Sequence, residues 1–186
     1  MDAVQTWFAA GFNQLHPMLQ DLHRHGGRLH GQIDIQYGRG LAGLLGKRFA
    51  AKFGLPLGVS STALDVHIHS DGQALYWQRT FSGATQRQSV FSPVGNWPAG
   101  YWLEKTGAVQ LVLAVQVIDG GWHWQPLQCR LFGVRIPLFC MPQVRAYKTI
   151  ENSQYRFYVG VSLPMLGFLF SYSGLLSAKL TPPSKR

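Results

Sequence analysis

The stretch TALDVHIHSDGQALYWQRTF, residues Thr62–Phe81, holds two runs of alternating polarity on either side of Asp71-Gly72. An Asp-Gly pair between such runs is the strongest short-range signal for a β-hairpin, because a type I′ turn requires positive φ at both central residues. With a two-residue loop, Ser70 pairs with Gln73 and the strands run antiparallel from there. The stretch therefore predicts a hairpin whose two faces are set by alternation.

One face of this hairpin is apolar, and Arg79 is its one charged member. Side chains alternate along a strand, so residues two apart share a face. A guanidinium on an inner face cannot be neutralised and needs a hydrogen-bonding partner or water. Arg79 is therefore either a polar site inside the sheet or a strand-end arginine that extends to solvent. The inner face consists of Thr62, Leu64, Val66, Ile68, Leu75, Trp77, Arg79 and Phe81.

The next turn extends the hairpin into a sheet. A tight turn at Ser82-Gly83 sets Phe81 against Ala84 and Arg79 against Gln86. In that register Gln86 and Gln88 join the inner face as neutral neighbours of Arg79.

A further hairpin is predicted around Thr106-Gly107, between strands over 101–105 and 108–118. Its register puts Glu104 and Trp102 on the core face, and Glu104 is the acid that falls there. Arg79 and Glu104 thus form the predicted buried ion pair. The alternative is a purely structural salt bridge, which rarely adds net stability over apolar residues.

Helices are predicted near the N-terminus. Apolar residues recur every three or four positions over 3–25, with a restart at Pro17 and an end at Gly26-Gly27. A half-buried strand over 29–37 follows. Residues 41–53 then form a second helical segment, whose inward residues are expected to be Leu41, Leu44, Leu45, Phe49 and Phe53.

The rest of the chain adds strands. Asp119-Gly120 turns into a strand over 122–131, and three more follow over 144–150, 155–162 and 168–176. We therefore predict a mainly β (α+β) fold. About ten antiparallel strands curve into a barrel or half-barrel, which limits exposed edges. Two to three helices lie near the N-terminus. Residues 1–180 form a single domain, and 181–186 form a disordered tail.

No charge falls between Arg156 and Lys179, a length that could span a bilayer. Pro164, Gly167 and the alternating pattern favour two core strands joined by a Pro-Met-Leu-Gly turn. A membrane segment over 157–178 is the alternative.

Composition bounds the class of protein. Hydrophobic residues make up 46% of the 186 and charged residues 13%, which is typical of a globular chain. The net charge of +9 favours anionic partners, but the positive residues are scattered, so nucleic acid is disfavoured. The sequence start, MDAVQTWF, lacks the basic segment of a signal peptide, and we expect a cytoplasmic protein that contacts membranes at most peripherally.

Metal and standard hydrolase chemistry are not indicated. His67 and His69 share an outer face with no third ligand beyond Asp65, so neither a metal nor another cofactor is expected. Cys129 and Cys140 form no C-x-x-C motif, which excludes a zinc knuckle, and both are expected to be buried thiols. No G-x-S-x-G or H-E-x-x-H sequence occurs. His16 is expected to cap or pack a helix, and His23 and His25 to lie charged at its C-terminus.

Three functions fit these observations. In the first, a small hydrophobic or amphipathic anionic ligand lies inside the curved sheet, with its carboxylate or phosphate on Arg79. In the second, Arg79 and Glu104 are the electrophile and acid–base pair of an enzyme, assisted by Tyr172 or His16. In the third, the protein binds membranes peripherally. The predicted ligand-binding residues are Trp77, Arg79, Gln86, Gln88, Trp102, Glu104, Phe157 and Phe170.

The order of short motifs along the chain resembles a bacterial family known as domain of unknown function 4166. The resemblance covers nearly the whole chain, but no acid follows the late proline, where Val144-Arg145-Ala146 stands. Members occur alone or appended to saccharopine-dehydrogenase-like reductases, which implies an accessory or ligand-handling role and a reductase as candidate partner. The motifs are Leu15-His16-Pro17 with His23, Gly31, Arg39-Gly40, Trp77-x-Arg79-x-Phe81 with Ser89, Glu104 with Gly107, Gly133, Pro137, Pro142, Pro164-x-x-Gly167 and Tyr172-x-Gly174.

Overall fold

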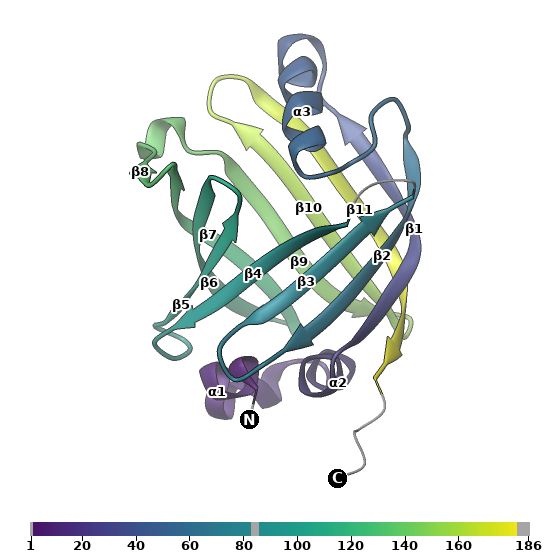
Figure 1. Ribbon diagram of the computed structural model, residues 1–186, viewed down its shortest axis with the longest axis vertical. Coiled ribbons are helices and arrows are strands. Elements are labelled where there is room, and N and C mark those ends of the chain that lie inside the picture. The colour runs from purple at the N-terminus through teal and green to yellow at the C-terminus, as the bar shows by residue number, and fades with distance from the viewer. Residues whose placement is uncertain (1, 83–85, 182–186) are drawn as a thin grey trace.

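The computed structural model describes residues 2–82 and 86–181. Within these ranges, ten strands close into an antiparallel β-barrel and one short strand, β8, lies outside it (Figure 1). The strands are β1 (Gly27–Tyr37), β2 (Ser61–Ser70), β3 (Leu75–Phe81), β4 (Arg87–Val94), β5 (Tyr101–Thr106), β6 (Val109–Ile118), β7 (Gly121–Leu131), β8 (Val134–Arg135), β9 (Gln143–Glu151), β10 (Gln154–Leu163) and β11 (Gly167–Leu180).

The barrel closes through β6 and β7. The strand order is β6-β5-β4-β3-β2-β1-β11-β10-β9-β7, and the additional β6–β7 pairing joins the two ends of that series. Every one of these pairings is antiparallel. Closure removes the exposed strand edges. The predicted mainly β fold is confirmed, and of its two forms the chain adopts the closed barrel.

The β2–β3 hairpin forms where predicted, but with a longer loop. Ser70 pairs with Leu75, so four residues separate the strands instead of two. Asp71 Oδ1 accepts hydrogen bonds from the backbone N–H groups of Gln73 and Ala74, each at 2.8 Å. Gly72 does not adopt the positive φ of a type I′ turn. The register is displaced by two residues, and because two is the period of a strand, Arg79 stays on the inner face.

The two following registers differ in their consequence. In the β5–β6 hairpin Thr106 pairs with Val109, so Glu104 faces Leu111 and keeps its inner position. In the β3–β4 pair Trp77 lies opposite Ser89, which displaces the predicted register by one residue. The prediction that Gln86 and Gln88 join the inner face is therefore wrong. Gly83 and Ala84, on which the predicted turn rested, lie outside the described residues.

Helices α1 (Ala3–Phe8) and α2 (Pro17–His25), with the 3₁₀ segment Ala9–Gln14 between them, lie across one end of the barrel (Figure 1). Asp2 Oδ1 accepts from the N–H groups of Val4 and Gln5 and caps α1. His16 Nδ1 accepts from Met18 N at 3.2 Å and caps α2, as predicted. These caps satisfy backbone donors that have no partner within a helix.

Helix α3 (Gly40–Lys52) lies at the other end of the barrel and packs on β11 through its small residues (Figure 1). Ala42, Gly43, Gly46 and Ala50 are its buried residues, whereas Leu41 and Leu44 are 73% and 57% exposed. The predicted inward face is therefore wrong for both leucines. The contact is backbone against backbone, because a Cβ on Gly46 would lie 2.1 Å from the Leu169 carbonyl oxygen. Leucine side chains cannot fit where the backbones of α3 and β11 come this close.

The charge-free C-terminal segment forms two strands, β10 and β11, around the predicted turn at 164–166. No helix in the described residues is long and apolar enough to cross a membrane. Of the predicted tail over 181–186, residues 182–186 lie outside the described residues.

Candidate functional site in the barrel interior

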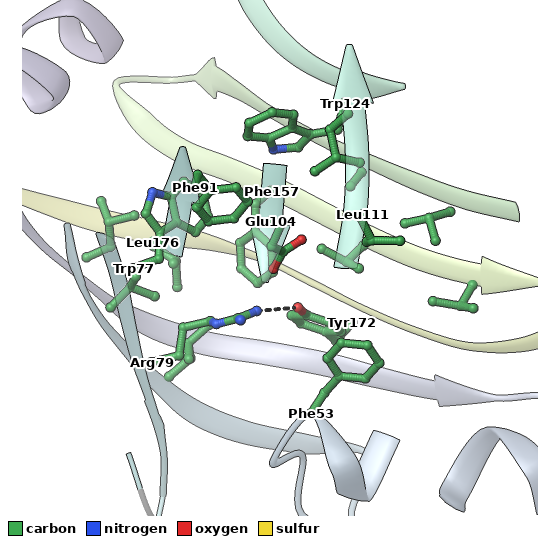
Figure 2. A pocket seen from close by; sticks show the side chains of 18 of the residues that line it. Phe53, Trp77, Arg79, Phe91, Glu104, Leu111, Trp124, Phe157, Tyr172 and Leu176 are labelled. Atoms are coloured by element: carbon green, nitrogen blue, oxygen red, sulfur yellow. Dashed lines mark hydrogen bonds between the residues drawn. The ribbon is translucent and has the colours of Figure 1, made fainter. Parts of the chain in front are cut away.

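The interior of the barrel contains a cavity of about 120 Å³. All ten barrel strands contribute to its wall, and Phe53, directly after α3, also lines it. The wall is mostly apolar, and its two charged side chains, Arg79 from β3 and Glu104 from β5, lie with Tyr172 from β11 in one region (Figure 2). The Tyr155 hydroxyl and the indoles of Trp77 and Trp124 also belong to the lining. The cavity is therefore mostly apolar, with one region in which charged and hydroxyl groups gather.

Arg79 reaches this region from the C-terminal half of β3 and is held by two hydroxyl groups. Its Nη1 donates to Tyr172 Oη at 3.2 Å (Figure 2), and its Nη2 donates to Ser89 Oγ. Ser89 is fully buried. Arg79 Nε is also buried and has no hydrogen-bond partner within the described residues. The two hydroxyls fix the plane of the guanidinium, as two hydrogen bonds to one fork do.

The hydroxyl of Tyr172 is affected by both charged residues of the polar region. Burial raises the pKa of its hydroxyl, the Arg79 charge and hydrogen bond lower it, and the Glu104 charge raises it. Both charged groups thus act on one hydroxyl, which places Glu104 within electrostatic reach of the Arg79–Tyr172 pair. Glu104 points into the same cavity (Figure 2). The structure brings the two predicted charges into one chamber.

The other predicted site residues divide into three groups. Trp77, Phe157 and Phe170 line the cavity. Trp102 does not line it: this residue is fully buried among the aromatic side chains toward α1, where its ring lies 5.3 Å from Trp7 and 6.0 Å from Trp122.

Three predicted residues lie elsewhere. Gln86 and Gln88 are exposed on the outside of the barrel, where both hydrogen bond to Gln78 at 3.0 Å. His16 is exposed at the start of α2, where its backbone N–H donates to the Gly120 carbonyl. These residues cannot contact a ligand inside the cavity.

A buried basic pair lies between the cavity wall and α2. Lys148 on β9 is 1% exposed, and its Nζ lies 2.8 Å from His23 Nε2. Burial lowers the pKa of Lys148 well below 10.5, and burial followed by the Lys148 charge lowers the pKa of His23 well below 6.5. The rings of Trp122 and Trp77, 3.8 and 4.7 Å from Nζ, favour the charged form and offset part of this effect. His23 is thus not the charged helix-end histidine that was predicted.

Strand alternation was not used to place Lys148 inside the barrel, and Ser89 was noted only as a motif residue and not as a partner of Arg79. Val144, Ala146 and Lys148 alternate on one strand, and the first two line the cavity. The same alternation places Lys148 inside. Ser89 required the β3–β4 register, which depends on a turn that includes undescribed residues.

The remaining candidate ligands are on or near the surface. His67 and His69 stack at 5.2 Å, and His69 stacks on Tyr76 at 4.8 Å, on the outer face. No group of three or more His, Cys, Asp or Glu residues suited to a metal occurs in the described part of the chain. Both cysteines are free, but Cys140 is exposed, so the expectation of two buried thiols is wrong for this residue.

The comparisons with known proteins agree with the motif order. A family model described as Domain of unknown function (DUF4166) matches residues 15–176, a range that contains Arg79, Glu104 and Tyr172. Comparison with curated proteins and with solved structures gives no match. The match confirms the resemblance inferred from short motifs. The chain belongs to the DUF4166 family.

Proposed function

We propose that this protein binds a small apolar or amphipathic ligand inside the barrel, with an anionic head on Arg79. The observation that carries the proposal is a cavity walled by every barrel strand, with a guanidinium held toward it by Ser89 and Tyr172. Small-molecule sites are typically concave, mostly apolar and equipped with a few fixed polar groups. The interior has this composition.

The electrostatics favour an anion over a cation at this position. Arg79 Nε is a buried donor without a hydrogen-bond partner among the described residues. An oxyanion placed beside it would gain a charge-assisted hydrogen bond, which is about twice as strong as a neutral one. Glu104, whose charge acts on Tyr172, is expected to disfavour ligands with two negative charges by repulsion.

The size of the cavity sets the size of the first ligands to test. An engineered apolar cavity of about 150 Å³ in another protein binds benzene. A volume of about 120 Å³ therefore suits a single ring or a short alkyl chain without movement of the wall. Longer chains require displacement of a lining side chain. Phe53 is the candidate, because it is the one described lining residue that does not belong to a barrel strand.

The test compares charged and neutral ligands of equal shape. Hexanoate and 1-hexanol are titrated into the wild type, and binding is followed by tryptophan fluorescence, since Trp77 and Trp124 line the cavity. Arg79→Met removes the guanidinium and keeps the length of the side chain. Arg156→Met is the matched control, because Arg156 makes its ion pair with Glu151 at an exposed position outside the cavity.

We expect the wild type to prefer hexanoate, and Arg79→Met to lose roughly tenfold or more of its hexanoate affinity while its affinity for hexanol is unchanged. Arg156→Met should behave as wild type. Native mass spectrometry of freshly purified protein should show a co-purifying small molecule. Absence of binding by either ligand, or a hexanoate preference that survives Arg79→Met, would contradict the proposal.

Catalysis is the second candidate function, and Tyr172 favours it. This hydroxyl is buried and receives a hydrogen bond from Arg79, and the Glu104 charge also acts on it. Such a trio can hold an oxyanion and move a proton. Under this function, Glu104→Gln abolishes turnover and leaves hexanoate binding in place. A Glu104→Gln variant that changes stability alone would support binding without chemistry.

A further inference from the structure

The two ends of the barrel differ in where apolar side chains are exposed. The strand directions place residues 38–60, 131–143 and 164–166 at one end, which we call the rim, and the helices α1 and α2 at the other (Figure 1). Among the described residues, most large exposed apolar side chains lie at the rim, whereas Ile118 and Leu180 lie at the helix-capped end. The apolar rim consists of Leu41, Leu44, Leu57, Val59, Leu131, Phe132, Val134, Phe139, Met165, Leu166 and Phe168.

The exposures at the rim are large. Phe132 and Phe139 are 82% and 77% exposed, and Met165 is fully exposed. Scattered exposed apolar residues are normal, but a cluster from three separate segments at one end is typical of an interaction site. The rim therefore has the composition of an interaction surface.

The charged residues of the rim segments indicate which kind of partner the rim suits. Segments 38–60, 130–145 and 163–168 contain several Lys and Arg residues and no Asp or Glu. Acids gather at the opposite end, where Asp2, Asp21, Asp71, Asp119 and Glu151 lie. The basic residues of the rim segments are all exposed: Arg39, Lys47, Arg48, Lys52, Arg130, Arg135 and Arg145. Apolar and cationic side chains without acids match the surface of an anionic bilayer.

Helix α3 shows the same combination on its outward face. Leu41 and Leu44 are exposed in its first turns, and Lys47, Arg48 and Lys52 are exposed further along. A helix with leucines and basic residues on its free face can lie in the interfacial plane of a membrane, with leucines among the acyl chains and cations on headgroups. Its inner face is occupied by β11, so the outward face is the one available.

We infer that the rim docks on anionic membranes, with the apolar side chains of α3, the 131–139 segment and the 164–168 turn inserted among the lipids. The other end of the barrel stays in water, because α1 and α2 cover it and the exposed carboxylates of Asp71 and Asp119 would be repelled by the same surface. The inference concerns the outside of the barrel and does not depend on what the cavity binds. If the cavity does bind an amphipathic ligand, docking puts Phe53 at the membrane side.

The test is vesicle flotation with the full chain. Vesicles of phosphatidylcholine alone are compared with vesicles of equal parts phosphatidylcholine and phosphatidylglycerol, at low and at high salt. The rim variant is Phe132→Ser with Phe139→Ser, and the charge variant is Lys47→Gln with Arg48→Gln. The matched control is Ile118→Ser with Leu180→Ser, two residues at the opposite end that are 47% and 40% exposed. Circular dichroism checks that every variant is folded.

We expect the wild type to float with anionic vesicles and to dissociate from them at high salt. The charge variant should partition about fivefold more weakly for each cation removed, and the rim variant roughly tenfold more weakly. The control variant and Arg79→Met should bind vesicles as wild type, which separates docking from ligand binding.

Two results would overturn the inference. One is wild-type protein that stays unbound to anionic vesicles at low salt. The other is a rim that joins two copies of the chain: sedimentation would then show a dimer that the rim variant converts to a monomer, with vesicle binding absent or equal in all variants.

Discussion

The helix-capped end and the rim end of this barrel use the same kinds of apolar residue in opposite ways. At the capped end, Trp7, Trp102 and Trp122 are buried almost completely. Trp7 and Trp122 pack edge to face with Phe8, and Trp102 packs in the same way with Trp7. At the rim, Phe132 and Phe139 stand in solvent. The helix-capped end therefore contributes to stability, whereas the rim has side chains available for contacts with a partner. Many enzymes show the same division between a stable scaffold and functional loops.

The sharpest way to break this comparison is to remove one aromatic ring from each end. Trp122→Ala leaves a large void among Phe8, Trp102 and Trp124, and we expect it to cost about 3–5 kcal/mol of unfolding free energy. Phe132→Ala should change stability by less than about 0.5 kcal/mol, because its ring is exposed. Urea unfolding measures both. Equal losses would show that the rim is part of the core.

A second substitution tests the packing of α3. Gly46→Ala puts a methyl group 2.1 Å from the Leu169 carbonyl oxygen, where the neighbour is backbone and cannot rotate away. We expect a loss of about 1–3 kcal/mol. Gly72→Ala is the matched control, since a Cβ there has no atom within 4 Å and Gly72 has no positive φ. Should both variants unfold at the same urea concentration, α3 would not be tightly seated.

The buried Lys148 gives the capped end a pH dependence that the rim lacks. Because its pKa is lowered in the folded protein, the unfolded chain holds one more proton between that lowered pKa and 10.5, and stability rises with pH in this window. Between pH 7 and 8.5 the rise is at most about 1.4 kcal/mol per pH unit. Below 6.5 the lowered pKa of His23 adds a slope of the same sign, so stability falls further on acidification.

Lys148→Met should remove the slope between pH 7 and 8.5 and leave the protein equally or more stable at pH 7, because a buried amine is replaced by an apolar chain of similar length. Urea midpoints at several pH values measure it. An unchanged slope would assign the pH dependence to other groups.

The smallest effect on stability is expected for a substitution at the rim. Phe139→Ser should alter the unfolding free energy by less than about 0.5 kcal/mol, since its ring is largely exposed. The same substitution, paired with Phe132→Ser, is expected to weaken vesicle binding. A change in stability without a change in vesicle binding would assign Phe139 to the fold and remove it from the rim surface.

Whether a predicted inner residue stays inside depends on whether the strand register is displaced by an even or an odd number of residues. The loops at Asp71 and Thr106 displaced their strands by two residues, so Arg79 and Glu104 still reached the interior. The β3–β4 register was displaced by one residue, which moved Gln86 and Gln88 outside and brought Ser89 in. Local loop chemistry, such as the Asp71 side chain accepting from Gln73 and Ala74, decides these lengths and is not encoded in hydrophobic alternation.

Two other errors arose because residues were assigned to the core or the surface from their hydrophobicity alone. Periodicity assigned Leu41 and Leu44 to the core, but α3 approaches β11 so closely that small residues take the contact. The alternation of β9 already placed Lys148 inside, yet a lysine is rarely assigned to a core. The leucine positions depend on how closely α3 approaches β11, which a single sequence does not supply, whereas the position of Lys148 could have been predicted from alternation.

The glycine contact between α3 and β11 has a mechanical consequence. Gly46 of α3 lies against the Leu169 carbonyl, and Gly38, just before the helix, lies against that of Phe168, so α3 and β11 cannot come closer together. Tyr172 is on the same strand and grips Arg79, three residues beyond the contact at Leu169. A displacement of α3 would therefore act on the same strand that carries the Tyr172 hydroxyl into the barrel.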